Sequence, residues 1–440
     1  MRLYFTTFLC VSFLCTSQVF AQSQCQSGRY AEAVFDCVDT TENIVYGQGR
    51  LNWSTTNIFC QHGALPPYNN FQDLLCDVYE PCNDSETARP LLIVIHGGAW
   101  AGGNKRDMAA YCHKMALRGY VVASISYRLS ITPNILCWNA ELDEKKLIRA
   151  FYRAMQDAKA AVRYFRAHAA DWNIDSDNIF AAGHSAGAFN TLGLAYLTDD
   201  SERPEATFQQ NYCGNWFNEI LCTDLGGIEG EGGNAGFSSS VKAVIPIAGA
   251  LPALDFLDGP NDPPMLLVHG TADDVVPYGG GCVLPAIRAL GLFNPCVYTY
   301  GSAVIYPYAD SIGMEAELLT FQGGAHDFTQ VQWDSIVSRS TRFLCCQLHD
   351  GNCQAVATET VFEKSPFEVF PNPTNGEIKI ETSHATNFTA QLYDMNGRLL
   401  LQEHFATNRA NLSLSNQPEG LYLLRLQTKG ETFATRIVKL

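Results

Sequence analysis

The stretch of sequence that indicates the fold most directly is Asn178-Ile-Phe-Ala-Ala-Gly-His-Ser-Ala-Gly-Ala-Phe-Asn190. An apolar run at 179–182 is followed at once by Gly183-His184-Ser185-Ala186-Gly187 and then by residues that a helix tolerates. This order predicts a strand, a tight turn and a helix, with Ser185 at the apex of the turn. The two glycines leave room where larger side chains would collide with neighbouring backbone. A serine hydroxyl is a weak nucleophile, so the chain must also supply a base, an orienting acid and oxyanion donors.

Strands and helices are predicted to alternate around this stretch. Residues 91–95 form a short, continuous apolar run, which suits a strand buried on both faces of a parallel sheet. Residues 143–168 have helical spacing, with Leu147, Phe151 and Phe165 on one face. Further strands are predicted at 74–79, 120–127, 241–247 and 265–269, and a further helix at 107–118. The alternation predicts an α/β fold with a doubly wound, mostly parallel sheet, whose ligands bind at the carboxyl ends of the strands.

Candidate partners for Ser185 follow two other predicted strands. The strand at 265–269 runs into a turn with Asp273 and Asp274, and either carboxylate can orient an imidazole and stabilise its charged form. The apolar run at 316–321 is followed by a glycine-rich loop that carries His326. Serine, aspartate and histidine therefore occur in the chain order that hydrolases with this strand–turn–helix use.

The stretch His96-Gly97-Gly98-Ala99-Trp100 follows the strand at 91–95 and predicts an oxyanion hole. Acyl transfer needs backbone N–H groups aimed at the tetrahedral oxyanion, and paired glycines let the backbone approach closely. The expected donors are the region of Gly98 and Ala99, together with Ala186 next to the nucleophile. Trp100 is a candidate substrate-binding residue in an aromatic acyl pocket, with core packing as the alternative. Chemistry of this kind requires no cofactor and no metal.

Composition and charge indicate a globular protein and argue against several classes of binding partner. The chain has 440 residues, of which 47% are hydrophobic and 17% charged, as in a well-packed globular protein. Its net charge of −16 argues against binding to nucleic acid and to anionic membrane surfaces. Residues 1–21 resemble a signal peptide, because Arg2 precedes an apolar run that ends near Val19-Phe20-Ala21. That run is shorter than the roughly 20 residues that span a bilayer, so no membrane insertion is expected; acylation at Cys15 is an alternative.

The cysteines predict disulfides. Of 16 cysteines, Cys10 and Cys15 fall within 1–21, and an even number remains in an exported chain. Local candidate pairs are Cys213 with Cys222 and Cys282 with Cys296. No spacing suggests a zinc site. Residues 22–73 form a cysteine-rich segment, and residues 22–85 are expected to be rich in loops, apart from the strand at 74–79.

Two further segments are set apart by composition. The connection at 198–240 is long and glycine-rich, which favours either a lid or substrate wall or a simple surface elaboration. After a linker at 351–365, residues 366–440 contain short alternating strands with turn signals at 394–397 and 418–420, which predicts a small all-β sandwich.

The motifs at 96–100, 126–129, 157–163, 183–187, 269–273 and 325–326 together resemble the α/β-hydrolase superfamily. The similarity is greatest to carboxylesterases with an HGGxW loop, which include bacterial feruloyl-esterase-like proteins, and it predicts a catalytic domain at 74–350. The resemblance implies that Ser185 is the nucleophile, His326 the base and Asp273, in preference to Asp274, the acid. Residues 366–440 resemble the type IX secretion sorting domain of Bacteroidota; a carbohydrate-binding module is the alternative.

These resemblances imply a secreted serine carboxylesterase that acts through an acyl-enzyme. Its expected substrates are feruloyl or acetyl side-chain esters of plant polymers, or polyesters, and its expected partner is the type IX secretion machinery. Two other classes compete. A serine peptidase of the prolyl-oligopeptidase type shares the order of the triad, but no propeller-like repeats precede the hydrolase segment. A non-catalytic binding protein on a hydrolase scaffold would typically have lost the serine or the histidine, and both are present.

Overall fold

The computed structural model of the protein describes residues 28–50, 71–130, 144–208, 224–283, 296–348, 367–371, 374–382, 387–394, 399–418, 420–428 and 432–439. The described residues fall into two compact units, one within Met1–Val356 and the other within Ala357–Leu440. Each unit has its own hydrophobic core. The larger unit holds all the candidate site residues.

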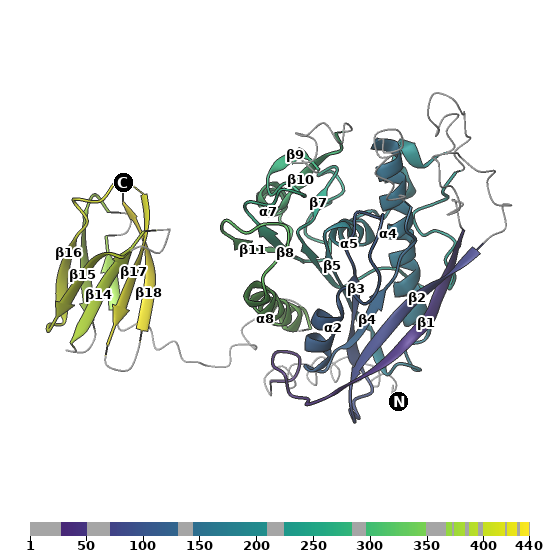
Figure 1. The fold of residues 1–440 in the computed structure, drawn as a ribbon, viewed down its shortest axis with the longest axis horizontal. Helices are drawn as coiled ribbons and strands as arrows, with labels where there is room; N and C mark the ends of the chain where they lie inside the picture. The colour runs from purple at the N-terminus through teal and green to yellow at the C-terminus, as the bar shows by residue number, and fades with distance from the viewer. Residues whose placement is uncertain are drawn as a thin grey trace, which may run out of the picture. The chain divides into compact units, whose positions relative to one another are not determined.

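An eight-stranded sheet forms the centre of the larger unit (Figure 1). Six of its strands run parallel, while β1 and β2 pair antiparallel with each other and β2 pairs antiparallel with β4. The strand order across the sheet is β1 (Val38–Arg50), β2 (Phe71–Pro81), β4 (Val121–Ile125), β3 (Arg89–Ile95), β5 (Ile174–His184), β6 (Ala243–Ile247), β8 (Met265–Gly270) and β11 (Ala316–Phe321). The predicted doubly wound, mostly parallel sheet is confirmed, with an antiparallel edge.

Helices cover both faces of the sheet, which explains why the central strands are apolar throughout. Alternate residues of β3 point to opposite sides, so Ile93 packs in one core cluster and Val94 in the other. The helices on the Ile93 side are α4 (Glu144–Ala167), α5 (Ala186–Tyr196) and α7 (Ser302–Ser311), and those on the Val94 side are α2 (Ala109–Ala116) and α8 (Gln330–Gln347).

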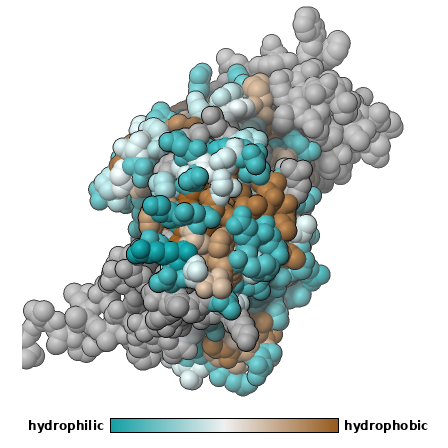
Figure 2. Space-filling view, turned by 90° about the vertical axis from the view of Figure 1, so that its left-hand side faces the viewer, coloured by the Kyte–Doolittle hydropathy of each residue, from teal (hydrophilic) through white to brown (hydrophobic). Residues whose placement is uncertain are grey.

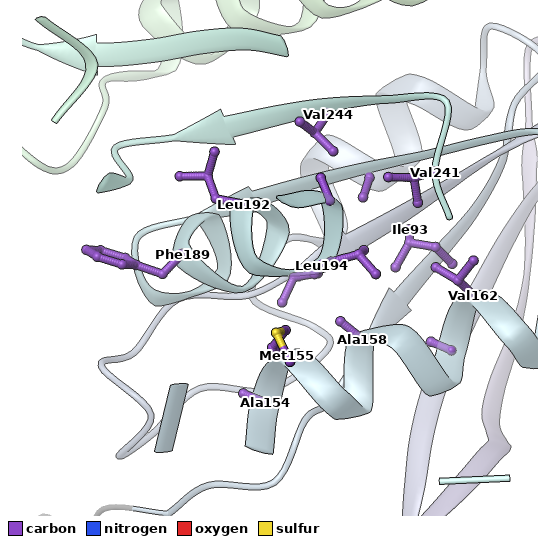
Figure 3. Close-up of a cluster of buried hydrophobic side chains, with 14 of the residues drawn as sticks. Ile93, Ala154, Met155, Ala158, Val162, Phe189, Leu192, Leu194, Val241 and Val244 are labelled. Atoms are coloured by element: carbon purple, nitrogen blue, oxygen red, sulfur yellow. The ribbon is translucent and has the colours of Figure 1, made fainter. Parts of the chain in front are cut away.

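The helix that follows Ser185 is held between α4 and the sheet. Figure 3 shows Leu192 and Leu194 of α5 among side chains of α4, β3 and β6, with Met155 of α4 close by. Every residue of α5 is buried. Gly193 allows this close packing, because a Cβ there would lie 2.7 Å from the Phe151 ring. The start of α5, where the candidate nucleophile sits, is therefore anchored by a dense apolar core.

Short elements complete the unit. They are the 3₁₀ helices η1 (Asp200–Glu202) and η2 (Glu205–Thr207) and a small antiparallel sheet of β7 (Ala250–Leu251), β10 (Tyr298–Gly301) and β9 (Gly280–Cys282).

The expectation that residues 22–85 are rich in loops is wrong for 38–50. These residues form the 13-residue strand β1, which pairs with β2 along its length. Most of its side chains are exposed, so no apolar alternation marks it in the sequence. Asn43 adopts a φ of 60° at an irregularity in the pairing, and its N–H donates to Asp77 Oδ1 at 2.9 Å. Pairing with β2, rather than local propensity, makes this segment a strand.

The expected disulfides are present among some of the cysteines. The predicted Cys282–Cys296 bond is present, and Cys37–Cys82 ties the start of β1 to the end of β2. Cys345 and Cys346 are also disulfide-bonded. Cys76 and Cys112, in contrast, are buried free thiols; burial raises the pKa of Cys112 to about 12 and makes both unreactive. The predicted Cys213–Cys222 pair lies outside the described residues.

The smaller unit is an all-β sandwich, as the alternating pattern predicts. One sheet contains β12 (Phe367–Phe370), β13 (Glu377–Thr382) and β16 (Arg409–Ser413), and the other contains β15 (Leu399–Phe405), β14 (Phe388–Tyr393), β17 (Gly420–Gln427) and β18 (Thr432–Lys439). Ile378 and Leu412 of the first sheet and Leu392 and Leu424 of the second share one buried cluster.

Figure 2 shows hydrophilic residues over much of one side, with hydrophobic residues gathered in patches between them. Within the described ranges, every helix is too short or too polar to cross a bilayer.

Candidate active site

Ser185 sits at the turn between β5 and α5. Its φ of 56° and ψ of −123° are a strained combination for a residue with a side chain, as is common at functional sites. The two flanking glycines are required: a Cβ on Gly183 would lie 2.2 Å from Gly187 O, and one on Gly187 would lie 2.1 Å from Ile95 O. The Ser185 N–H donates to Ile247 O at 2.9 Å, which fixes the turn to β6. The predicted strand–turn–helix is present.

Ser185, His326 and Asp273 form one hydrogen-bonded line. The Ser185 hydroxyl lies 2.8 Å from His326 Nε2, and His326 Nδ1 lies 2.8 Å from Asp273 Oδ2. Asp273 and His326 are each only 9% exposed. The parallel pairing of β8 with β11 sets Gly270 beside Phe321, so the loops that carry the acid and the base leave the sheet together.

The Asp273 carboxylate is held by several donors. Its Oδ1 accepts from the N–H groups of Val275 and Val276 at 2.9 and 2.8 Å. Burial alone would raise the pKa of Asp273, but hydrogen bonds from His269 and His326 hold it well below its usual range. The group is therefore ionised near neutral pH. Asp274, which the residue pattern alone left as an alternative, is exposed.

The predicted oxyanion loop lies against Ser185. A Cβ on Gly97 would lie 3.1 Å from Ser185 Cβ, so even a methyl group there would have to displace the loop or the serine by a few tenths of an ångström. Gly98 has a φ of 109°, and a Cβ there would lie 2.2 Å from Gly102 O. Ala99 also adopts a positive φ, of 51°. Because α5 begins at Ala186, the N–H of this residue has no carbonyl partner within the helix.

Trp100 is a core residue with a hydrogen bond. Its indole N–H donates to Asn190 Oδ1 at 3.0 Å, and its ring packs edge-on against Phe151 and Phe189. It is 9% exposed. This environment fits the packing alternative better than a substrate pocket, and the bond to α5 braces the oxyanion loop against the helix that follows Ser185.

Three histidines near the triad were not assigned a role from the sequence. His96 is fully buried and stacks on Tyr127, with 4.3 Å between the ring centroids. His184 precedes the nucleophile, and its Nε2 lies 3.3 Å from the carbonyl oxygen of His326. Burial lowers the pKa of His184 to about 4, so the ring is neutral and its Nε2–H donates to that carbonyl. The third, His269, is fully buried beside Asp273.

The described parts of the 198–240 segment pack along α4. The Tyr152 hydroxyl donates to Gly226 O at 3.0 Å, and Glu229 forms ion pairs with Lys159 and Arg163 at 3.4 and 2.6 Å. These contacts fit a surface elaboration for 224–240. Residues 209–223, where the lid alternative would have to apply, lie outside the described residues.

Two families of known proteins match this chain. The family described as BD-FAE matches residues 76–285, which include Ser185 and Asp273, and the family described as Secretion system C-terminal sorting domain matches residues 368–440. A sorting domain of this kind implies secretion to the cell surface or the extracellular space.

Curated relatives match a shorter region. The protein named "Probable carboxylic ester hydrolase LipM" from Mycobacterium tuberculosis is 30% identical over 131 residues, covering 30% of this chain and 26% of the relative. Esterase-5B from Drosophila persimilis is 27% identical over 129 residues, covering 29% of this chain and 22% of the relative. The chain thus spans about a quarter of the length of these relatives.

Among solved structures, esterase 2 of Thermogutta terrifontis phosphonylated by cyclosarin is 20% identical, with a TM-score of 0.43, over 63% of this chain and 90% of that one. Its propionate-bound form is 21% identical, with a TM-score of 0.42, over 62% and 89%. From the family matches, the chain carries a BD-FAE domain of the α/β-hydrolase class, followed by a secretion system C-terminal sorting domain.

Proposed function

We propose that the protein is a secreted serine hydrolase of carboxylic esters that acts through an acyl-enzyme. The observation that carries this proposal is the continuous line from Ser185 Oγ through the His326 ring to Asp273 Oδ2, with both distances at 2.8 Å. The match to the BD-FAE family and the names of the curated relatives support an ester as the substrate. The sorting domain supports export by the type IX machinery.

The first half of the reaction forms the acyl-enzyme. Ser185 Oγ attacks the ester carbonyl carbon while its proton passes to His326 Nε2, and the carbonyl oxygen becomes the oxyanion. Donors from the Gly98–Ala99 region and Ala186 N–H stabilise that oxyanion. When the tetrahedral intermediate collapses, the bond to the alcohol oxygen breaks and His326 returns the proton to the leaving alcohol.

The second half releases the acid. A water molecule gives its proton to His326 as its oxygen attacks the acyl carbon, and the bond to Ser185 Oγ then breaks with return of the proton to the serine. Asp273 stays ionised throughout, because its hydrogen bonds keep its pKa low, and its charge stabilises the imidazolium of His326 in both steps.

For the substrate, we propose side-chain esters of plant polymers, feruloyl or acetyl, with polyesters as the nearby variant. Export of the enzyme would bring it to polymers that cannot enter a cell. The cofactor-free triad requires nothing from the substrate beyond an accessible ester carbonyl.

Hydrolysis of p-nitrophenyl esters, from acetate to decanoate plus a ferulate ester, tests the reaction. We expect turnover by the wild type, a loss of about five to six orders of magnitude in kcat for Ser185→Ala, and no change for Ser201→Ala, an exposed serine. Release of acetate or ferulate from xylan tests the substrate class. Faster cleavage of peptide p-nitroanilides than of esters would replace the proposal with a serine peptidase, and no turnover of either by a folded wild type would favour a binding protein.

A further inference from the structure

The carboxylate of Asp273 has two imidazole neighbours, and only one of them belongs to the triad. His269 Nε2 lies 3.3 Å from Asp273 Oδ2, the same oxygen that accepts from His326. It also lies 3.1 Å from the carbonyl oxygen of Val276. On the other side of the ring, His269 Nδ1 lies 2.8 Å from the hydroxyl oxygen of Ser302.

These contacts determine where the proton of a neutral His269 ring sits. Nε2 faces two oxygens that can only accept, a carbonyl and an ionised carboxylate, so Nε2 must carry the hydrogen. Nδ1 then has a lone pair, and the Ser302 hydroxyl is the donor that satisfies it. Ser302 therefore selects the tautomer that donates toward Asp273, in the way that second partners orient histidines elsewhere.

The backbone is built to bring these groups together. His269 is the penultimate residue of β8, and Ser302 is the first residue of α7; both side chains are fully buried. Gly301 allows α7 to start here, because a Cβ at that position would lie 1.9 Å from Pro277 O. Gly270 in turn lets the His326 loop approach, because a Cβ there would lie 2.3 Å from Gly324 O.

We propose that His269 is a positioning residue for the acid of the triad, with Ser302 setting its tautomer. The hydrogen-bonded line then has five members: Ser302, His269, Asp273, His326 and Ser185. The inference rests on the proposed function for its catalytic consequence, but the geometry it describes exists without substrate. The N–H groups of Val275 and Val276 hold only Oδ1 of the Asp273 carboxylate. By contacting Oδ2, His269 fixes the rotation of the carboxylate.

Two substitutions of His269 distinguish the role of its Nε2 from that of its Nδ1. In His269→Gln the amide nitrogen reaches as far as Nε2, so the donor toward Asp273 and Val276 is kept. In His269→Asn the amide reaches only as far as Nδ1, so the contact with Ser302 can be kept and the donor toward Asp273 is lost. Both variants leave a polar amide of similar chemistry in the same buried place, so they form a matched pair. Ser302→Ala removes the tautomer-setting hydroxyl and leaves His269 unchanged.

We expect kcat to fall in the variants that lose the hydrogen-bond donor toward Asp273. In the full chain, His269→Asn should lower kcat about ten- to hundredfold with little change in KM, because a misplaced acid misaligns the base and not the bound ester. His269→Gln should retain most of the wild-type kcat, and Ser302→Ala should lie between the two. The proton on His326 Nδ1 gives a second measurement, as a low-field signal in the proton spectrum. That signal should persist in His269→Gln and broaden or disappear in His269→Asn.

The proton spectrum keeps this test independent of the proposed function, since it requires no turnover. A wild type that cleaves no ester but shows the signal, with loss in His269→Asn, would overturn the esterase proposal and leave the role of His269 standing. If the signal is unchanged in a folded His269→Asn, or if both variants lose stability equally with kcat unchanged, His269 is only a core histidine that holds the turn at Val276, and the inference is wrong.

Discussion

His326 Nδ1 lies 2.8 Å from Asp273 Oδ2, whereas the neighbouring Asp274 is exposed to solvent. Asp273→Asn should therefore lower kcat by about four orders of magnitude, because an amide in that place favours the wrong tautomer of His326. Asp274→Asn removes the same charge one residue away and should leave kcat within about twofold of wild type. Steady-state kinetics on a p-nitrophenyl ester compares the two. Equal losses would show that the turn tolerates neither substitution and that the contact to His326 is not what matters.

Gly97 brings the predicted oxyanion loop close to Ser185. A Cβ there would lie 3.1 Å from both His184 O and Ser185 Cβ, so Gly97→Ala must push the serine or the loop by a few tenths of an ångström. We expect kcat to fall about ten- to hundredfold in a protein that still folds. Gly102→Ala, in the same loop, is the control, since its Cβ would meet nothing within 4 Å. The prediction fails if the two variants have the same kcat.

His184 should make the protein sensitive to acid. Burial, with the nearby His326, lowers its pKa to about 4 in the folded state, against an ordinary value of 6.5. The unfolded chain therefore binds a proton that the folded protein does not, and this penalty grows as the pH falls from 6.5 to about 4. The resulting loss in the free energy of unfolding amounts to about 3 kcal/mol at most.

His184→Gln keeps a polar side chain that does not titrate in this range. The free energy of unfolding, measured with urea between pH 7 and pH 4, should therefore fall less steeply for His184→Gln than for wild type. Parallel curves for the two proteins would contradict the prediction and would leave other groups to explain any acid sensitivity.

Arg153 of α4 is buried and Arg128, which precedes that helix, is half-buried, and their environments differ. Arg128 pairs with Asp157, with Nη2 at 2.7 Å from Oδ1. Among the described residues, Arg153 has only the Ser130 hydroxyl, at 3.0 Å from Nη1, and its Nε has no partner. Burial, with the nearby Arg128 and Arg149, lowers the pKa of Arg153 to about 9.

Removing the charge of Arg153 and removing that of Arg128 should thus have different effects on the free energy of unfolding. Arg153→Met is expected to leave the free energy of unfolding unchanged or raise it by about 1–2 kcal/mol, because a poorly compensated buried charge is replaced by an apolar chain of similar length. Arg128→Met should lower it by about 3–5 kcal/mol, because Asp157 is left buried without its cation. Urea denaturation measures both. A large loss in Arg153→Met would instead mean that its charge is well compensated in the fold.

Much of the fold could be predicted because local sequence patterns indicate the buried strands and the tight turn directly. Strands covered on both faces leave continuous apolar runs, as at Leu91–Ile95, and the turn around Ser185 requires Gly183 and Gly187 whatever else surrounds it. The motifs around Ser185, Asp273 and His326, together with their order along the chain, nominated these residues, and the family resemblance preferred Asp273 to Asp274. The sandwich at the end of the chain likewise follows from alternation within short strands. The strand β1 escaped prediction because an exposed edge strand carries no such pattern.

By itself, then, the sequence determined the class of sheet and the strained turn, since these depend on neighbours within a few residues, and it nominated Ser185 and His326 as the proposed nucleophile and base. Only the tertiary structure decided the contacts between distant segments: the contact of Asp273 with His326, the Cys37–Cys82 bond, and the packing of Trp100 against Phe151 and Phe189. The contact of Ser302 with His269 is of the same kind, because the two residues are 33 positions apart. The physical reason is that strand register and the close approach of distant backbone segments determine which side chains meet across the sheet. Neither can be predicted from the residues that neighbour a side chain in the sequence.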